Sequence, residues 1–137
     1  MAITAYLLYE DVAGALKFLS KAFGFKKHGR PMSGSDGKLQ HAAMQLDKDF
    51  IMMGYPGPEY KSPRRLGQAT MNLYVNVSDV DKHYKRAKKA GARILEEPQD
   101  TFYGHRRYGA ADPEGHEWYF AHEIKKPARR TRPTKKK

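Results

Sequence analysis

One order of structural signals occurs twice in this chain, and it limits the folds that the chain can adopt. Asp11 and Asp79 each precede an amphipathic segment, and Gly24 and Gly91 each follow one. The two aspartates are 68 residues apart and the two glycines 67. Asp is a favoured N-cap and Gly a favoured residue just beyond a helix, so both segments are predicted to be helices. The constant separation indicates an internal duplication.

Each copy of the repeated unit is predicted to consist of a strand, a helix and three further strands. In the first helix, apolar residues follow one another at intervals of four, three and four, which places them along one face. The second helix is predicted over residues 80–90. Strands are predicted at residues 3–9, 39–46, 50–55, 70–77, 92–97, 106–112 and 116–123. The Gly, Ser and Pro content of residues 31–38 and 56–68 predicts loops there.

The first strand of the second copy alternates strictly between apolar and polar or aromatic residues. Leu73, Val75 and Val77 point to one side, and Asn72, Tyr74 and Asn76 point to the other. The apolar side is expected to face the helix, which leaves a polar and aromatic face suited to a ligand. The predicted fold class is therefore α+β, with two βαβββ modules that form a curved mixed sheet with a ligand cup.

The length of 137 residues suits one domain. We expect a single domain over residues 1–124, with modules at about 1–55 and 69–124 and a linker at 56–68. The formal charge is +11, but eight of the 26 lysines and arginines fall in residues 125–137, which contain no acid. Residues 1–124 thus carry 18 basic and 15 acidic residues. Residues 125–137 are predicted to be a disordered basic tail.

The composition excludes several classes of protein. The chain contains no cysteine, which rules out disulfides, thiolate metal sites and cysteine nucleophiles. No apolar run approaches the roughly 18 residues of a membrane span, and the first residues lack the pattern of a secretory signal. We therefore expect a cytoplasmic protein that does not enter a membrane.

Three segments together resemble one known family. The segment GHRRYGAADPEGHEWYF (104–120) is similar to the final hairpin of glyoxalase/bleomycin-resistance proteins, the vicinal oxygen chelate superfamily, which also includes dioxygenases. The segments YLLYEDVAGALKFLSKAFGF (6–25) and VSDVDKHYKRAKKAGA (77–92) resemble the starts of its two modules. The resemblance covers about residues 3–124. It implies paired βαβββ modules, a ligand cup and, usually, a homodimer.

Enzymes of this superfamily hold a divalent metal with His, Glu or Gln side chains from four strands. By alignment, the corresponding residues here are Thr4, Met52, Asn72 and Tyr119. A hydroxyl, a thioether, an amide and a phenol make a poor site for zinc, nickel, iron or manganese. We therefore expect no metal and no other cofactor.

Thr4, Met52, Asn72 and Tyr119 are instead candidates for contacts with a small-molecule substrate or ligand. There are further candidates, and no residue is assigned a catalytic role. His41 lies within a predicted strand and either faces the cup or is a partly buried structural histidine. Arg106 is the candidate for binding a carboxylate or phosphate, although the neighbouring Arg107 is an alternative, since adjacent residues alternate faces. We expect His83 to be solvated and His116 to make a structural hydrogen bond. Aromatic residues expected to line the cup are Tyr6, Tyr74, Tyr103 and Tyr119.

Three functional hypotheses remain. The first is a glyoxalase-like protein that binds a small molecule in a cup without a metal, either as a binder only or as a metal-independent enzyme. The second is a metal-dependent lyase, isomerase or dioxygenase of the glyoxalase type. The third is a nucleic-acid-associated protein that makes weak contacts through the basic tail, residues 125–137.

Overall fold

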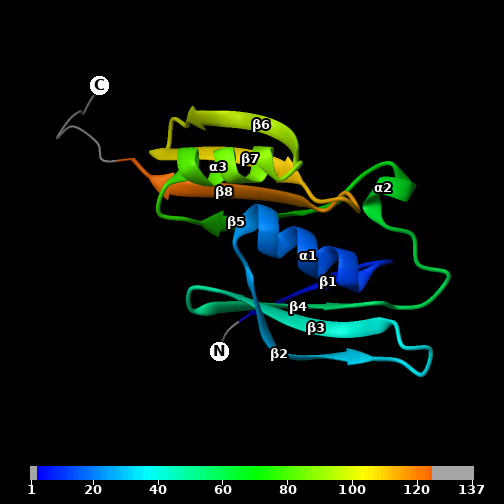
Figure 1. The fold of residues 1–137 in the computed structure, drawn as a ribbon. Coiled ribbons are helices and arrows are strands. Elements are labelled where there is room, and N and C mark those ends of the chain that lie inside the picture. Colours follow the sequence, from blue (N-terminus) through cyan, green and yellow to red (C-terminus); the bar gives the residue numbers. More distant parts are fainter. Residues whose placement is uncertain (1–2, 125–137) are drawn as a thin grey trace.

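The computed structural model describes residues 3–124, and these residues form eight strands and three helices (Figure 1). The predicted tail, residues 125–137, lies outside the described residues. The elements of the first module are β1 (Ala5–Leu8), α1 (Val12–Phe23), β2 (Lys26–Ser33), β3 (Leu39–Leu46) and β4 (Asp49–Gly54). The connecting helix is α2 (Pro63–Leu66). The elements of the second module are β5 (Asn72–Asn76), α3 (Val80–Lys89), β6 (Arg93–Asp100), β7 (His105–Ala111) and β8 (Glu117–Glu123).

The strands form two four-stranded mixed sheets with the same topology. The first sheet has the order β1-β4-β3-β2 and the second the order β5-β8-β7-β6. β1 is parallel to β4 in the first sheet, and β5 is parallel to β8 in the second sheet. The other neighbouring strands are antiparallel. The predicted α+β class with two βαβββ modules is confirmed. The two sheets lie edge to edge along β1 and β5 but do not share a hydrogen-bonded ladder.

The predicted helix caps are present. The carboxylate of Asp11 accepts a hydrogen bond from the Gly14 amide at 3.0 Å, and that of Asp79 accepts one from the Lys82 amide at 3.1 Å. Gly24 ends α1 with a φ of 82°, a left-handed conformation that glycine adopts without steric cost. Local sequence therefore specifies where both long helices begin, and Gly24 specifies where α1 ends.

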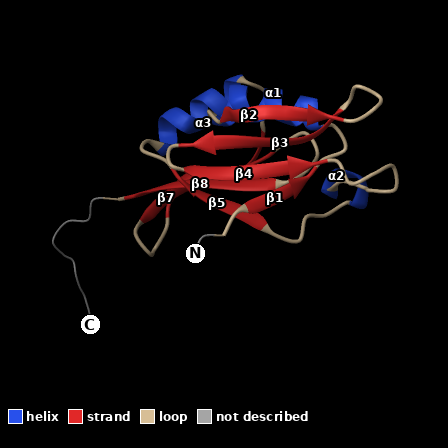
Figure 2. Ribbon diagram, turned by 90° about the horizontal axis from the view of Figure 1, so that it is seen from below, coloured by secondary structure: helices blue, strands red, loops and turns tan. Residues whose placement is uncertain are grey.

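The two long helices lie on the same side of the sheets and contact each other (Figures 1 and 2). Arg86 of α3 donates hydrogen bonds to the carbonyls of Ser20 and Lys21 at the end of α1, at 2.9 and 3.0 Å. Phe23 of α1 is fully buried, and its ring centroid lies 4.7 Å from that of Phe120 and 5.6 Å from that of Trp118 in the second sheet. One continuous core thus joins the two modules.

A buried carboxylate also joins the modules. Asp112 is 4% exposed, and its Oδ2 accepts hydrogen bonds from the Tyr9 hydroxyl at 2.6 Å and the Trp118 indole nitrogen at 3.2 Å. Its Oδ1 accepts hydrogen bonds from the backbone amides of Glu114 and His116. Burial, together with the neighbouring negative charge, raises the pKa of Tyr9 well above its usual value. The Tyr9 hydroxyl therefore stays protonated and acts as the donor.

Three elements differ from the sequence-based prediction. β6 runs through Pro98 to Asp100 instead of ending before the proline. It is an edge strand with irregular register, so the missing backbone N–H of a proline does not cost a hydrogen bond of the sheet. β2 extends to Ser33, into the predicted loop at 31–38. The predicted loop at 56–68 contains α2, which has a proline at its start. None of the described helices is long and apolar enough to cross a membrane.

Candidate functional site

Each sheet has one face packed against the helices and one face turned away from them, which we call the open face. In β5 the side chains of Asn72, Tyr74 and Asn76 are exposed, whereas Leu73 and Val75 pack against the core. This is the predicted alternation, and it is confirmed. Residues paired in register share a face, so Tyr119 and Gly109 lie on the open face beside Tyr74.

Polar and aromatic side chains form a hydrogen-bonded cluster on the open face of the second sheet. The Tyr74 hydroxyl lies 2.9 Å from Nδ1 of His105 and 3.2 Å from the Tyr103 hydroxyl. Arg107 donates to the Tyr103 hydroxyl from Nη1 at 3.2 Å. The cluster draws Tyr74 from β5, His105 and Arg107 from β7, and Tyr103 from the β6–β7 loop. We call these four residues, together with Tyr119, the tyrosine–arginine cluster.

Arg107 is held in place by partners on two sides. Its Nε donates to Glu96 at 2.8 Å, and this pairing raises the pKa of Arg107 above its usual value. Its guanidinium carbon lies 5.1 Å from the centroid of the Tyr119 ring, within the range of a cation–π interaction. The ring of Tyr119 in turn lies against Gly109, where an added Cβ would approach Tyr119 Cε2 to 2.5 Å. Glycine at position 109 therefore allows the ring to lie flat against β7.

The two linked tyrosines have opposite pKa shifts. Burial, followed by the hydrogen bond to Tyr103, raises the pKa of Tyr74 to about 12. The hydrogen bond with Tyr74 lowers the pKa of Tyr103, and the nearby Arg107 guanidinium acts in the same direction. Either hydroxyl can be the donor in this pair, and the Tyr103 oxygen also accepts a hydrogen bond from Arg107, which favours negative charge on that oxygen.

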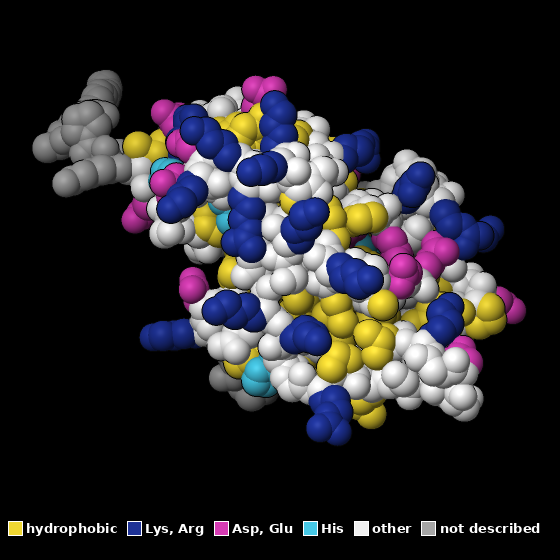
Figure 3. All heavy atoms as spheres, viewed as in Figure 1, with side chains coloured by type: hydrophobic (Ala, Val, Ile, Leu, Met, Phe, Trp, Pro, Cys, Tyr) yellow, Lys and Arg dark blue, Asp and Glu magenta, His cyan; other side chains and the backbone are white. Residues whose placement is uncertain are grey.

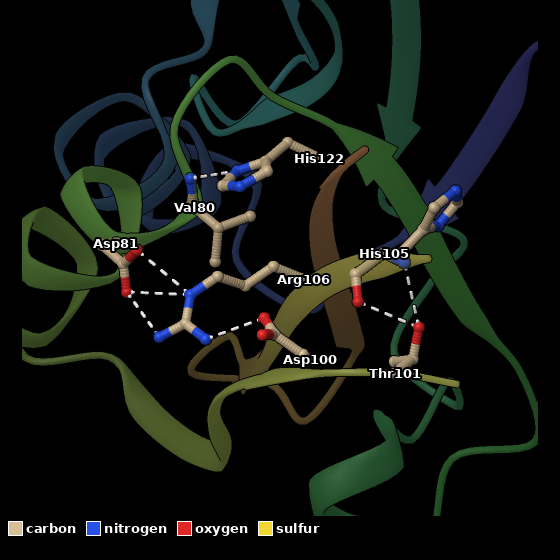
Figure 4. A network of polar contacts seen from close by, with 7 residues as sticks. All are labelled: Val80, Asp81, Asp100, Thr101, His105, Arg106 and His122. Carbon is tan, nitrogen blue, oxygen red and sulfur yellow. Dashed lines mark hydrogen bonds and ion pairs between the residues drawn. The ribbon is translucent and has the colours of Figure 1, made fainter. Parts of the chain in front are cut away.

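Arg106, the arginine predicted to bind a ligand, does not lie on the open face. Its guanidinium is on the helix side, where Nη2 lies 2.9 Å from Asp81 of α3 and Nη1 lies 3.0 Å from Asp100 (Figure 4). The adjacent His105 points the other way, as expected for successive residues of a strand. Both carboxylates raise the pKa of Arg106 further. Arg107, the alternative considered from the sequence, is the arginine on the open face.

The open face of the first sheet is more apolar. Tyr6 of β1 lies in register with Met52 of β4, and its ring centroid is 5.7 Å from that of His41 on β3. Thr4 precedes β1 and is exposed. Tyr6, His41 and Met52 therefore lie on one face, but on a different sheet from Tyr74 and Tyr119. Four large apolar side chains on this face are exposed: Tyr6 at 49%, Leu8 at 38%, Met32 at 63% and Phe50 at 42%.

Two hollows of about 300 Å³ each lie where β1 and β5 run next to each other. The first is bordered by Tyr6, Tyr60 and Asn72, and the second by Phe50 and Tyr74. Tyr103, Arg107 and Tyr119 do not line either hollow; they lie on the open surface beside them. A single chain thus presents two open faces with two hollows between them, and we call each open face a half-cup.

The residues at the superfamily's metal positions do not form a metal site. Thr4 and Met52 belong to the first module, and Asn72 and Tyr119 to the second. Their donors are a hydroxyl, a thioether, an amide and a phenol, which do not suit a divalent transition metal. Within residues 3–124, no three His, Cys, Asp or Glu side chains are placed to hold a metal ion. The donor set therefore does not fit the metal of this superfamily's enzymes.

Two histidines have structural partners. His116 Nε2 lies 2.7 Å from the Leu8 carbonyl, which confirms the structural hydrogen bond expected from the sequence. The expectation that His83 is solvated is wrong. Its Nε2 donates to the Phe23 carbonyl at 3.0 Å, and its Nδ1 lies 2.6 Å from the Tyr108 hydroxyl. The helical periodicity placed His83 outside the apolar stripe, but α1 packs against this side of α3 and covers it.

We expect the melting temperature to fall as the pH is lowered through about 6.5, because His83 is half-buried and its surroundings disfavour the charged imidazolium. Burial lowers the pKa of His83 below its usual value of 6.5. The unfolded chain therefore binds a proton before the folded chain does, so stability is lost as the pH falls, by at most about 1.4 kcal/mol per pH unit for one group. Thermal unfolding at pH 5 to 8 measures this. His83→Gln is expected to flatten the dependence, and an unchanged dependence in this variant would contradict this role of His83.

Two residues of the open face, Glu96 and His105, are not among the candidates selected from the sequence, and Arg107 is there only as the alternative to Arg106. The strand pairing indicates which residues of β7 share the open face. Gly109 is opposite Tyr119, and residues two and four positions before it, Arg107 and His105, share its face. The pairing of β7 with β8 was needed to apply this rule, and the sequence pattern does not specify that register.

Comparison with known proteins identifies relatives over most of the chain. A family model described as the Glyoxalase/Bleomycin resistance protein/Dioxygenase superfamily matches residues 3–120. An uncharacterized protein of Mycobacterium bovis is 33% identical over 129 residues, which cover 90% of this chain and 84% of that protein. An uncharacterized protein of Mycobacterium tuberculosis strain H37Rv is also 33% identical over 129 residues, which cover 75% of its length.

Solved structures with the same fold include one at comparable identity. TioX from Micromonospora sp. ML1 is 31% identical, with a TM-score of 0.73 over 90% of this chain and 99% of that chain. A member of the same superfamily from Sphaerobacter thermophilus is 18% identical, with a TM-score of 0.69 over 90% of this chain and 98% of that one. The second likeness concerns the fold alone.

Proposed function

Because the chain belongs to the Glyoxalase/Bleomycin resistance protein/Dioxygenase superfamily, we propose that it binds a small molecule on its open faces without the help of a metal. The protein then acts either as a binder or as a metal-independent enzyme. The observation that carries this proposal is the tyrosine–arginine cluster, in which aromatic rings and polar groups converge on one exposed surface. Surfaces of this kind bind a ring by stacking and orient it through a few hydrogen bonds.

The chemistry of the cluster favours an aromatic compound that carries a polar substituent. Tyr74 offers a ring face and Tyr119 a ring edge, whereas Tyr103 and His105 offer hydrogen-bonding atoms. Arg107 is already paired with Glu96, so its charge is largely compensated before a ligand arrives. A neutral or weakly acidic substituent, such as a phenol or an amide, therefore fits better than a strongly charged one.

We propose that the protein is a homodimer in which a second copy completes each half-cup. Tyr6, Leu8, Met32 and Phe50 form an exposed apolar surface on the first sheet, and such surfaces in soluble proteins commonly mark interaction sites. The open face of the second sheet is polar and aromatic. Pairing the first sheet of one copy with the second sheet of the other would enclose the tyrosine–arginine cluster and exclude water from it.

A fluorimetric thermal-shift screen of mono- and bicyclic aromatic compounds that carry hydroxyl or amide groups tests the proposed function. Compounds that bind only the folded protein raise its melting temperature, with a stabilisation of about 2.7 kcal/mol at 100 times the dissociation constant. Tyr119→Ala is expected to abolish the shift. Tyr84→Ala is the matched control, since Tyr84 is also a half-buried tyrosine but belongs to α3. Compounds that stabilise Tyr119→Ala as much as the wild type would rule out this site.

We expect the purified protein to contain no stoichiometric transition metal, since the side chains at the superfamily's metal positions are poor ligands. Elemental analysis after expression in medium supplemented with zinc, nickel, iron and manganese measures this. The alternative function, a metal-dependent lyase, isomerase or dioxygenase, requires about one of these metals per chain. Such a result would replace the metal-free proposal.

A further inference from the structure

The long helices carry a dense group of exposed lysines on the side of the molecule opposite the open faces. These lysines, which we call the helix-lysine face, are Lys17 and Lys21 of α1 and Lys82, Lys85, Lys88 and Lys89 of α3. Figure 3 shows basic side chains spread over the surface that carries the helices, with the acidic side chains mainly at its margins. The lysines are scattered in the sequence, and only the packing of α1 against α3 brings them together.

Among the described residues, no lysine of this face forms an ion pair. Asp81 is the only acidic residue in α1 or α3, and it is paired with Arg106. The ion pairs within residues 3–124 involve Arg65, Arg106 and Arg107, and none involves a lysine of this face. Arg86, the remaining basic residue of α3, is bound to carbonyls of α1.

The positions of these lysines are unfavourable for the helices themselves. Lys17 and Lys21 are four residues apart, and Lys85 lies three residues after Lys82 and four before Lys89, spacings at which like charges repel. The helix dipole accounts for Lys88 and Lys89, which lie in the last turn of α3. It does not account for Lys82, which is in the first turn, where the dipole disfavours a cation. A polyanion would relieve this repulsion.

The surroundings of the lysines indicate which polyanion fits. Binding to a membrane surface normally adds apolar side chains that insert between lipids. The large exposed apolar residues within 3–124 all lie outside α1 and α3. Binding to single-stranded nucleic acid normally adds exposed aromatic rings for stacking, and Tyr84, the only aromatic residue of α3, is half-buried. Flexible lysines without such partners suit the regularly spaced phosphates of a duplex.

We propose that the helix-lysine face binds the phosphate backbone of duplex nucleic acid, without reading the base sequence. The proposal goes beyond small-molecule binding and does not depend on it, since the open faces lie on the other side of the sheets. It also differs from a contact made by residues 125–137, whose eight basic residues belong to another part of the chain.

The test compares two variants of the full chain with equal net charge. One variant carries Lys82→Gln, Lys85→Gln and Lys89→Gln, and the control carries Lys38→Gln, Lys48→Gln and Lys61→Gln at exposed loop positions. Fluorescence anisotropy with a labelled 20-base-pair duplex of mixed sequence measures affinity at several salt concentrations. Each lost phosphate contact lowers the slope of log affinity against log salt by about 0.9, so the helix variant should lose roughly two to three units of slope. The control should keep the wild-type slope.

Several results would overturn the proposal. The first is a wild-type chain that does not bind the duplex. The second is an equal loss of slope in both triple variants, because net charge alone would then explain binding. The third is unchanged binding in both triple variants together with complete loss on deletion of residues 125–137. The fourth is that the wild-type chain binds phosphatidylserine vesicles more tightly than the duplex and that the helix variant loses this vesicle binding. Circular dichroism melting checks that the glutamines, which are good helix formers, leave the fold intact.

Discussion

Replacing Asp112 with alanine is expected to lower the free energy of unfolding by about 3–5 kcal/mol, because it removes the acceptor at the centre of a buried network. The Tyr9 hydroxyl and the Trp118 indole N–H would both lose their acceptor, as would the backbone amides of Glu114 and His116. Tyr9 and Trp118 are fully buried, so water does not replace the lost bonds. Urea unfolding followed by far-ultraviolet circular dichroism measures the effect.

Two further variants test whether the loss of stability in Asp112→Ala comes from the buried hydrogen bonds. Asp36→Ala removes an exposed carboxylate that accepts one hydrogen bond from the Lys38 amide, and we expect a change within about 0.5 kcal/mol. Asp112→Asn keeps one carbonyl acceptor and is expected to fall between wild type and Asp112→Ala. If Asp112→Ala were within about 1 kcal/mol of wild type, the buried network would not be what holds the two modules together.

The second large effect concerns assembly. Light scattering at micromolar concentration is expected to give a mass near twice 15.7 kDa, because a second copy that covers the exposed apolar surface of the first sheet removes this surface from water. Phe50→Glu, which places a charge on this surface, is expected to weaken the dimer by at least about tenfold, since burial of an unpaired carboxylate is costly. Sedimentation over a range of concentrations measures the change.

The matched control for the assembly experiment is Leu66→Glu. Leu66 is 63% exposed and belongs to α2, outside the strands of the first sheet. We expect this variant to remain dimeric. A wild-type protein that is monomeric at micromolar concentration would contradict the dimer. Equal weakening of the dimer by Phe50→Glu and Leu66→Glu would show that the interface is not on the open face of the first sheet.

The overall architecture was predictable because its signals are local and occur twice. The caps Asp11 and Asp79 are reproduced in the structure, as is the alternation of Leu73 and Val75 with their polar neighbours. Such signals depend on hydrogen bonds and side-chain directions within a few residues. Tyr6 and Tyr74 are exposed, at 49% and 42%, and their expected role in lining a ligand cup stays a prediction.

Contacts between the modules depended on the tertiary structure. The carboxylate of Asp112 meets the Tyr9 hydroxyl across 103 residues, and His83 meets the Phe23 carbonyl across 60. The choice between Arg106 and Arg107 required the register of β7 against β8, which no local pattern specifies. The lysines of α1 and α3 form one surface only because the two helices pack together. By itself, the sequence determined the modules, since each depends on interactions between near neighbours. The tertiary structure decided which side chains meet, because those contacts join residues far apart in the chain, whose pairing depends on packing of the whole core.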